Sequence, residues 1–410
     1  MTTFRPSRRL LLGAGLTLPV LGSLPLMAQE PEDAPAPEPD PDYHPADDAP
    51  TLLILGGTRF LGPAVVQSAK ARGYRITLWN RGRSNPHLFP ELEKLVGDRD
   101  SGDLSALEGR KWDLVVDTSC YLPSHAAKAA EVLGDNVGHY VLISTISVYE
   151  NGGGEQYDVD ETAAVAPISD EDVAKVTSIR EVMTDGGIYY GPLKALCEAK
   201  LEELMPGRVT SLRPGVICGK DDPSDRLPYW VERVRRGGEI LCPAPRDQDF
   251  QFTDVDDLAD WSMDLGAAGK GGLFNAIGFD AKVTLEEFLH GCKIVLGTND
   301  ASFTWASEEF LLENEVRPFS ELPFWLPAEW SHHYVNDALI AAGATFRPIA
   351  ETIEKTNEWH LAERGKDYEW RWYGMQPERE AELLAAWHGR DAEPAEEPEV
   401  EPDGEAPGDA

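Results

Sequence analysis

The chain has 410 residues, of which 42% are hydrophobic, and this is enough for one large core or for a core with an appended lobe. Its formal net charge is -35, and part of that charge lies in acidic stretches near the two ends of the chain. So negative a surface repels phosphate backbones and anionic lipid headgroups, which disfavours nucleic acids and membrane surfaces as partners.

The N-terminal residues have the pattern of an export signal. Ser7-Arg8-Arg9-Leu10-Leu11-Leu12 matches the twin-arginine pattern, and the stretch that follows to Ala28 is uncharged and rich in Leu, Gly and Ala. We predict a signal peptide over residues 1–28, cleaved near residue 29, and delivery of the folded protein to the periplasm. The alternative is an uncleaved membrane anchor, although Pro19 and Pro25 suit a spanning helix poorly. After cleavage we expect no stable membrane insertion.

Two acidic, proline-rich segments bracket the rest of the chain. Residues 29–50 and 386–410 contain too few apolar residues to bury a core, so we predict a disordered linker and a disordered tail. The five cysteines between them are scattered without a Cys-x-x-Cys pair, which predicts isolated buried thiols rather than disulfides or a zinc site. These cysteines are Cys120, Cys197, Cys218, Cys242 and Cys292.

The first folded segment has the pattern of a β-α-β unit. Thr51–Leu55 is a short apolar run typical of a buried parallel strand, and a helical pattern from Ala64 to Ala71 precedes a second strand at Arg75–Trp79. Between the first strand and the helix stands the turn Gly56-Gly57-Thr58-Arg59-Phe60-Leu61-Gly62. Glycines allow backbone N–H groups to approach a pyrophosphate at a helix N-terminus. This context favours a dinucleotide-binding domain over a purely structural turn.

This turn resembles the Gly-x-x-Gly-x-x-Gly of extended short-chain dehydrogenase/reductases, with Arg59 where the middle glycine usually stands. The variant is similar to that of a bacterial group of epimerase/dehydratase-like proteins and of chloroplast stem-loop RNA-binding proteins. The resemblance covers about residues 51–365 and implies an α/β fold: a Rossmann-type doubly wound parallel sheet with a smaller C-terminal substrate-binding lobe. We place the cofactor domain at 51–215 and the lobe, with strands returning to the sheet, at 216–385. A homodimer is compatible with these features.

The residues after the second strand bear on the choice of cofactor. An acid there would bind the ribose 2′-hydroxyl of NAD, whereas arginine suits the 2′-phosphate of NADP. The chain has Asn80, Arg81 and Arg83 and no acid, so we favour NADP over NAD; solvated surface arginines are the alternative. Further on, Asp98 resembles the adenine-contacting acid of the family.

The predicted catalytic group follows the fifth strand. Asp113–Asp117 and Tyr140–Ile143 have the pattern of buried strands, and the second leads into a segment that resembles the family's Ser-Ser-x-x-Val-Tyr, in which Thr145 holds the catalytic position. Tyr190 and Lys194 then resemble the Tyr-x-x-x-Lys motif. On a helix these two residues share a face, so we expect the ammonium to stand beside the phenol and to favour its ionised form. The resemblance makes Tyr190 the general acid/base and lets Lys194 bind the nicotinamide ribose.

The second half is less informative. Arg213-Pro214-Gly215 resembles the segment where the family's chain leaves the cofactor domain, and Arg226 and Trp230 are our candidates for substrate contact, with ordinary packing as the alternative. Residues 150–188 are an insertion that could cover the substrate or be an ordinary surface loop. His332 and His333 are adjacent, so they do not share a helix face and predict no metal site.

Together these features predict an NAD(P)-dependent oxidoreductase or epimerase/dehydratase that acts on a small sugar-like or other hydroxyl or carbonyl substrate. Export weakens the case for nucleotide sugars, which are cytoplasmic. The alternative is a non-catalytic NAD(P)-binding scaffold. The presence of Thr145, Tyr190 and Lys194 favours the enzyme.

Overall fold

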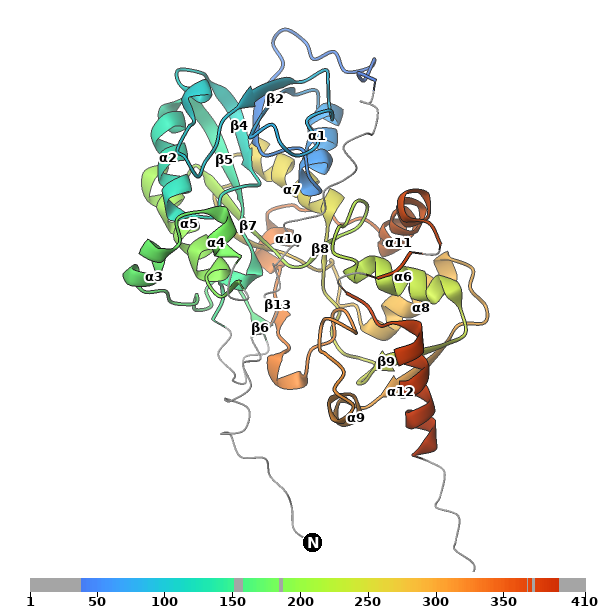
Figure 1. Cartoon of the computed structure of the whole chain (residues 1–410). Coiled ribbons are helices and arrows are strands. Elements are labelled where there is room, and N and C mark those ends of the chain that lie inside the picture. Colours follow the sequence, from blue (N-terminus) through green and yellow to red (C-terminus); the bar gives the residue numbers. More distant parts are fainter. Residues whose placement is uncertain (1–37, 151–157, 184–186, 367, 371–372, 391–410) are drawn as a thin grey trace, which may run out of the picture.

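A seven-stranded sheet lies at the centre of the larger part of the computed structural model (Figure 1). The structure describes residues 38–150, 158–183, 187–366, 368–370 and 373–390. The predicted signal peptide, residues 29–37 of the predicted linker, and residues 391–410 of the predicted tail lie outside the described residues.

The sheet has the strand order β11-β7-β5-β4-β1-β2-β3, and every neighbouring pair is parallel. The order reverses between β1 and β4, which is the mark of a doubly wound sheet. The strands are β1 (Thr51–Leu55), β2 (Arg75–Asn80), β3 (Glu93–Val96), β4 (Trp112–Asp117), β5 (Val137–Ile143), β7 (Val209–Pro214) and β11 (Gly272–Ala276).

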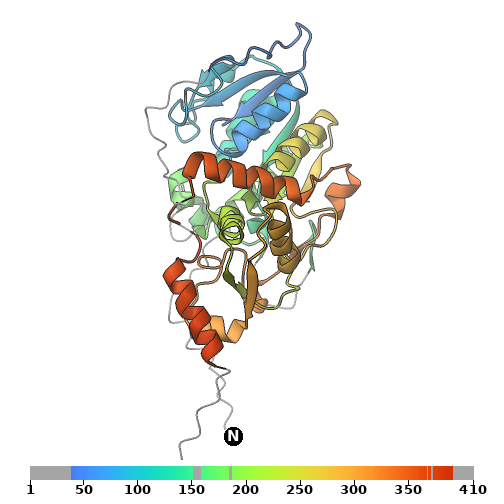
Figure 2. The ribbon, with the colours of Figure 1, turned by 90° about the vertical axis from the view of Figure 1, so that its right-hand side faces the viewer.

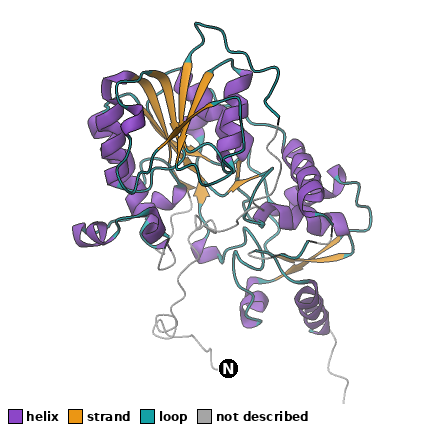
Figure 3. Cartoon of the chain, turned by 45° about the horizontal axis from the view of Figure 1, so that its top comes forward, coloured by secondary structure: helices purple, strands orange, loops and turns teal. Residues whose placement is uncertain are grey.

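Helices cover both faces of the sheet (Figure 3). Leu52 and Ile54 of β1 point into a core with α1 (Leu61–Ala71) and α7 (Val255–Ala267). Leu53 and Leu55 point into a second core with α2 (Pro123–Leu133) and α5 (Tyr190–Leu204). Because these strands are buried on both faces, their sequences are continuously apolar and do not alternate between apolar and polar residues.

The remaining elements build a smaller lobe with a core rich in aromatic rings. Within it α11 packs on α6 and α8, and β9 pairs with β12 in parallel; Figure 2 shows α11 between the sheet and the rest of the lobe. Its principal elements are α6 (Arg226–Arg236), β9 (Glu239–Pro243), α8 (Leu285–Val295), β12 (Ser302–Ala306), α9 (Glu308–Glu313), α11 (Ile349–Trp359) and α12 (Pro377–Gly389). Thr284 and Glu287 form a capping box at the start of α8.

Short elements join the sheet and the lobe. The chain crosses between them through the parallel pair β8 (Ile217–Cys218) and β10 (Thr253–Asp254), and α10 (Asp337–Ala341) contacts β11. The described part of the 150–188 insertion contains β6 (Asp158–Val159), α3 (Asp170–Lys175) and α4 (Ile179–Val182). Strand β6 pairs with β13 (His333–Tyr334), so this part of the insertion is tied to the C-terminal half.

Residues 38–50 differ from the disordered linker expected from their composition. Tyr43 donates a hydrogen bond to the carbonyl of Tyr74 over 3.0 Å, and Asp40 forms an ion pair with Lys70 at 3.0 Å. Arg75 donates to the carbonyls of Ala46 and Asp47. This segment therefore packs on α1 and β2 as part of the folded domain.

Candidate active site

The glycine turn connects β1 to α1 at the carboxyl end of the sheet, where open α/β sheets bind their ligands. Gly56 and Gly57 have φ angles of 121° and 94°, which side chains rarely adopt. A Cβ on Gly62 would stand 2.5 Å from the carbonyl carbon of Gly57, so only glycine fits there. The seven turn residues predicted to bind the cofactor thus form one tight bend into the helix. They are Gly56, Gly57, Thr58, Arg59, Phe60, Leu61 and Gly62.

Side chains from the next loop hold this bend in place. Asn80 donates to the carbonyl of Gly56 over 3.0 Å, and Asn85 donates to the carbonyl of Thr58 over 2.9 Å. The first N–H groups of a helix suit an anion, because most of them have no partner within the helix. In α1 the N–H of Gly62 donates to the carbonyl of Arg59 over 2.9 Å. Asn85 was not among the predicted residues, since a lone asparagine in a loop carries no pattern.

The structure places the predicted cofactor-selecting residues beside this bend. Arg81 and Arg83 follow β2 and are exposed, and Arg59 in the turn itself is also exposed. Asp98 is half-buried after β3, where its carboxylate accepts a hydrogen bond from the backbone N–H of Asp100 over 3.1 Å. Cofactor contact by Arg81, Arg83 and Asp98 stays a prediction.

Thr145 and Tyr190 come together at the carboxyl end of β5. The Thr145 hydroxyl follows that strand and hydrogen-bonds the phenol of Tyr190, the first residue of α5. Gly191 makes this approach possible, since a Cβ there would lie 1.8 Å from the carbonyl oxygen of Ser147. Burial raises the pKa of Tyr190 to about 12, while its hydrogen bond with Thr145 acts in the opposite direction. The phenol is therefore protonated at neutral pH.

Lys194 lies one helical turn after Tyr190 but does not act as the sequence suggested. Its ammonium donates hydrogen bonds to the carbonyls of Cys120, over 2.6 Å, and of Ile143, over 2.5 Å. The sequence predicted that this cation lowers the pKa of Tyr190; burial raises that pKa instead, and Lys194 is not among the causes of the shift. The ammonium is bound instead by one carbonyl in the loop after β4 and one at the end of β5. An ammonium has three N–H donors, so two are used there and one remains for a ligand.

A second tyrosine stands beside this pair and was missed from the sequence. Tyr121 lies in the loop after β4, and its ring centroid is 6.1 Å from that of Tyr190. The Nζ atom of Lys194 is 5.4 Å from the centroid of the Tyr121 ring. The one available signal was its position after the strand at which the sheet order reverses.

A buried ion pair supports the segment that carries Thr145. Arg213 on β7 binds the carboxylate of Glu198 on α5 through two hydrogen bonds of 3.0 and 2.6 Å. Ser144, directly before Thr145, donates to the same carboxylate over 2.5 Å. Glu198 thus connects the helix of Tyr190 and Lys194 to the strand end that presents Thr145.

The proposed substrate residues lie in the smaller lobe. Arg226 is buried, donates to the Tyr373 hydroxyl over 3.0 Å and lies over that ring at 4.4 Å. Trp230 is fully buried, and its indole N–H donates to the carbonyl of Pro323 over 2.8 Å. Substrate contact by either residue stays a prediction; what the structure shows for the Trp230 ring is core packing.

The described part of the chain contains no group of His, Cys, Asp and Glu side chains arranged to hold a metal ion. His333 pairs instead with Asp249, which raises the pKa of the imidazole.

All five cysteines are buried and none is in a disulfide, as the sequence predicted. No described helix has both the length and the apolar character needed to span a bilayer.

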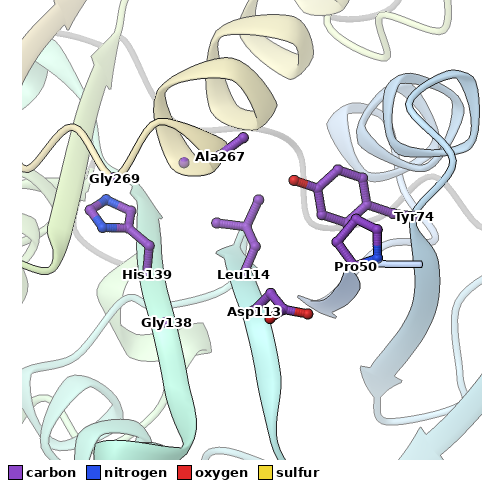
Figure 4. Close-up of a pocket in the computed structure, with 9 residues that line it drawn as sticks. Pro50, Tyr74, Asp113, Leu114, Gly138, His139, Ala267 and Gly269 are labelled. Carbon is purple, nitrogen blue, oxygen red and sulfur yellow. The ribbon is translucent and has the colours of Figure 1, made fainter. Parts of the chain in front are cut away.

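A cavity of about 370 Å³ lies at the opposite, amino-terminal edge of the sheet (Figure 4). Asp113 and His139 line it, near the first residues of β4 and β5. The Asp113 carboxylate accepts hydrogen bonds from Thr51, and His139 is 2.7 Å from the hydroxyl of Thr210. Because these polar groups already contact Thr51 and Thr210 of the fold, we assign no function to this cavity.

Solved structures similar to this chain are dehydratases and epimerases with the same sheet. The dTDP-glucose 4,6-dehydratase of Bacillus anthracis str. Ames, in complex with NAD, aligns with a TM-score of 0.55 and 14% identity over 78% of this chain and 98% of that chain. UDP-glucose 4-epimerase of Thermotoga maritima, with UDP-glucose, gives 0.52 and 16% over 76% and 99%. A human epimerase family protein with NADPH gives 0.51 and 17% over 75% and 99%.

At these identities the likeness shows the fold, and it confirms the Rossmann-type α/β architecture predicted from the sequence. No protein-family model and no curated protein matches the chain.

Proposed function

We propose that this chain is an NAD(P)-dependent epimerase/dehydratase or reductase of the extended short-chain dehydrogenase type. The observation that carries the proposal is the pairing of Thr145 with Tyr190 beside Lys194, at the same edge of the sheet as the glycine turn. The similar solved structures described as dehydratases and epimerases, in complex with NAD or with NADPH, support it.

Tyr190 is the proton donor and acceptor of the proposed reaction. Its phenol is protonated at neutral pH, so it can donate to a substrate carbonyl oxygen and take the proton back from the alcohol in the reverse direction. Thr145 orients the phenol and can hydrogen-bond the same substrate oxygen. When bound, the cofactor supplies or accepts the hydride.

The turn residues and Lys194 fit such a cofactor. Gly57 and Gly62 form a bend that a Cβ would fill, and the N–H groups at the start of α1 suit a pyrophosphate. The remaining N–H of Lys194 suits the nicotinamide ribose. For the adenosine end, Arg81 and Arg83 support NADP over NAD, because exposed guanidiniums can pair with a 2′-phosphate.

The twin-arginine pattern of Arg8 and Arg9 supports a periplasmic location for the mature protein. A protein exported by this route can fold around its cofactor in the cytoplasm before it crosses the membrane. Because nucleotide sugars are cytoplasmic, we propose a free sugar, a glycoside or another hydroxyl or carbonyl compound as the substrate.

The experiment that tests this function compares Tyr190→Phe with Tyr189→Phe, a matched control at the preceding residue. Turnover would be followed by NADPH absorbance on carbonyl and sugar substrates to which the native protein responds. We expect Tyr190→Phe to lose about 10²–10⁴-fold in turnover with unchanged cofactor affinity, since only a proton-transferring hydroxyl is removed. The control should retain turnover.

Unchanged turnover in Tyr190→Phe would contradict the proposed role of the phenol. If the native protein binds the cofactor but turns over nothing on a broad panel, the non-catalytic scaffold becomes the better account.

A further inference from the structure

Tyr121 occupies a place between the parts of the proposed active site. It follows Cys120, whose carbonyl accepts a hydrogen bond from Lys194, and its ring lies next to both the Lys194 ammonium and the Tyr190 ring. The two phenol rings are inclined by 39°, so they pack at a tilt rather than as a parallel stack. Tyr121 is therefore the one residue of the loop after β4 that contacts this pair through a ring.

Resting on the function proposed above, we propose that Tyr121 is a positioning residue of the active site. Its ring holds the Lys194 ammonium against the carbonyls of Cys120 and Ile143, so that the remaining N–H of Lys194 stays available to the cofactor ribose. The same ring limits the movement of the Tyr190 phenol.

The physical basis is the flexibility of lysine. Its ammonium is a compact charge at the end of a flexible four-carbon side chain, which can swing away from its two carbonyl partners. While both hydrogen bonds are made, the tetrahedral nitrogen also fixes the direction of the third N–H, so an aromatic ring that stabilises the ammonium at this position keeps that donor in place. A cation over an aromatic face adds about 0.5–2 kcal/mol, the upper part of the range applying where water is excluded, as it is around the buried Lys194. This corresponds to a factor of about two to thirty in an equilibrium constant.

The ionisation state of Tyr121 agrees with this role. Burial raises the pKa of its phenol to about 12, although the positive charges of Lys194 and Arg59 act in the opposite direction. The phenol is neutral at physiological pH. Tyr121 therefore offers no phenolate that would bind the N–H groups of Lys194 in place of a ligand.

The test requires no cofactor in its first step. Native protein, Tyr121→Leu and Tyr121→Phe would be acylated with trace acetic anhydride, and the modification rate of Lys194 measured by peptide mass spectrometry. We expect an increase of about two- to thirty-fold in Tyr121→Leu, which removes the ring, and a native rate in Tyr121→Phe, which keeps it. Tyr43→Leu is the matched control, because the Tyr43 ring lies 5.1 Å from Nζ of a different lysine, Lys70.

The second step measures dissociation constants of NADPH and NADH for the same variants. Tyr121→Leu should weaken binding by a similar factor, whereas Tyr121→Phe and Tyr43→Leu should not. If the native chain binds neither cofactor, the proposed function fails, while the acylation rates still decide whether Tyr121 holds Lys194.

An unchanged Lys194 rate in Tyr121→Leu would overturn the proposal, as would equal increases in Tyr121→Leu and Tyr121→Phe. Native cofactor affinity in Tyr121→Leu would overturn it as well. If Tyr121→Leu does not fold, Tyr121→Met provides the same comparison, because methionine fills irregular space without an aromatic face.

Discussion

The buried carboxylate of Glu198 offers a strong test of how the catalytic segment is held together. Glu198 and Arg213 are both almost fully buried, and Glu198 also accepts a hydrogen bond from Ser144. The change Glu198→Gln keeps the size of the side chain but removes its charge. It therefore leaves the Arg213 guanidinium in a buried place without a counter-charge.

Breaking a buried ion pair by removing one partner costs about 3–5 kcal/mol, because the remaining charge stays out of water. We expect Glu198→Gln to lie near the lower end, since the amide oxygen can still accept one of the hydrogen bonds. Replacing both partners with apolar residues, as in Glu198→Leu with Arg213→Met, should restore most of the stability, because no unpaired charge remains.

The assay is urea unfolding at pH 7, with Glu203→Gln as the matched control. Glu203 lies on the same helix and pairs with Lys200 at the surface, where such pairs contribute about 0–1 kcal/mol. The account would be refuted if Glu198→Gln lost no more unfolding free energy than Glu203→Gln. A double variant less stable than Glu198→Gln would also contradict the reasoning.

Three further predictions concern the cofactor, pH and export. Arg81→Asp should reverse a preference for NADPH over NADH in fluorescence titrations, and tighter NADH binding by the native chain would reject the arginine argument. Burial raises the pKa of Asp257 to about 6, and the charge of Asp254 adds to this. At Asp257 the native state thus binds more protons than the unfolded chain between about pH 4 and pH 6, so the contribution of this group to stability should fall by about 3 kcal/mol as the pH rises through this window. Asp257→Asn should flatten this dependence in unfolding measured across the window; an unchanged slope would contradict the assignment. Replacing Arg8 and Arg9 with lysine should stop export in cell fractionation, and a native cytoplasmic product with Met1 retained would contradict the signal.

The local patterns of the sequence were sufficient to predict the sheet and the glycine turn. Thr51–Leu55 and Asp113–Asp117 are apolar runs, and both form central strands buried on two faces. The close approach of Gly62 to Gly57 also follows from a turn between a strand and a helix. In these cases neighbours in the sequence determine the structure.

The details of the active site depend on contacts between distant segments, which local patterns do not encode. The i to i+4 spacing of Tyr190 and Lys194 predicted a shared helix face, but the partners of the ammonium are carbonyls in the loop after β4 and at the end of β5. Tyr121 joins the site only because β4 lies next to β1 and β5 in the sheet.

Composition was also a poor guide where a few specific contacts outweigh it. Residues 38–50 are rich in proline and acids, yet Tyr43 and Asp40 attach them to the fold. The sequence made Arg226 a candidate for substrate contact, and in the structure its guanidinium lies over two aromatic rings of the lobe.

The central claim is that the glycine turn binds a nicotinamide dinucleotide, and the most direct test is a fluorescence titration of NADPH with native protein, Gly62→Ala and Gly389→Ala. A Cβ at Gly62 would meet the backbone of Gly57, whereas a Cβ at Gly389 meets nothing within 4 Å. The account predicts saturable binding to the native chain and to Gly389→Ala. Binding to Gly62→Ala should be about 5- to 150-fold weaker, which corresponds to the 1–3 kcal/mol that overpacking typically costs. Failure of the native chain to bind either NADPH or NADH, or native affinity in Gly62→Ala, would contradict it.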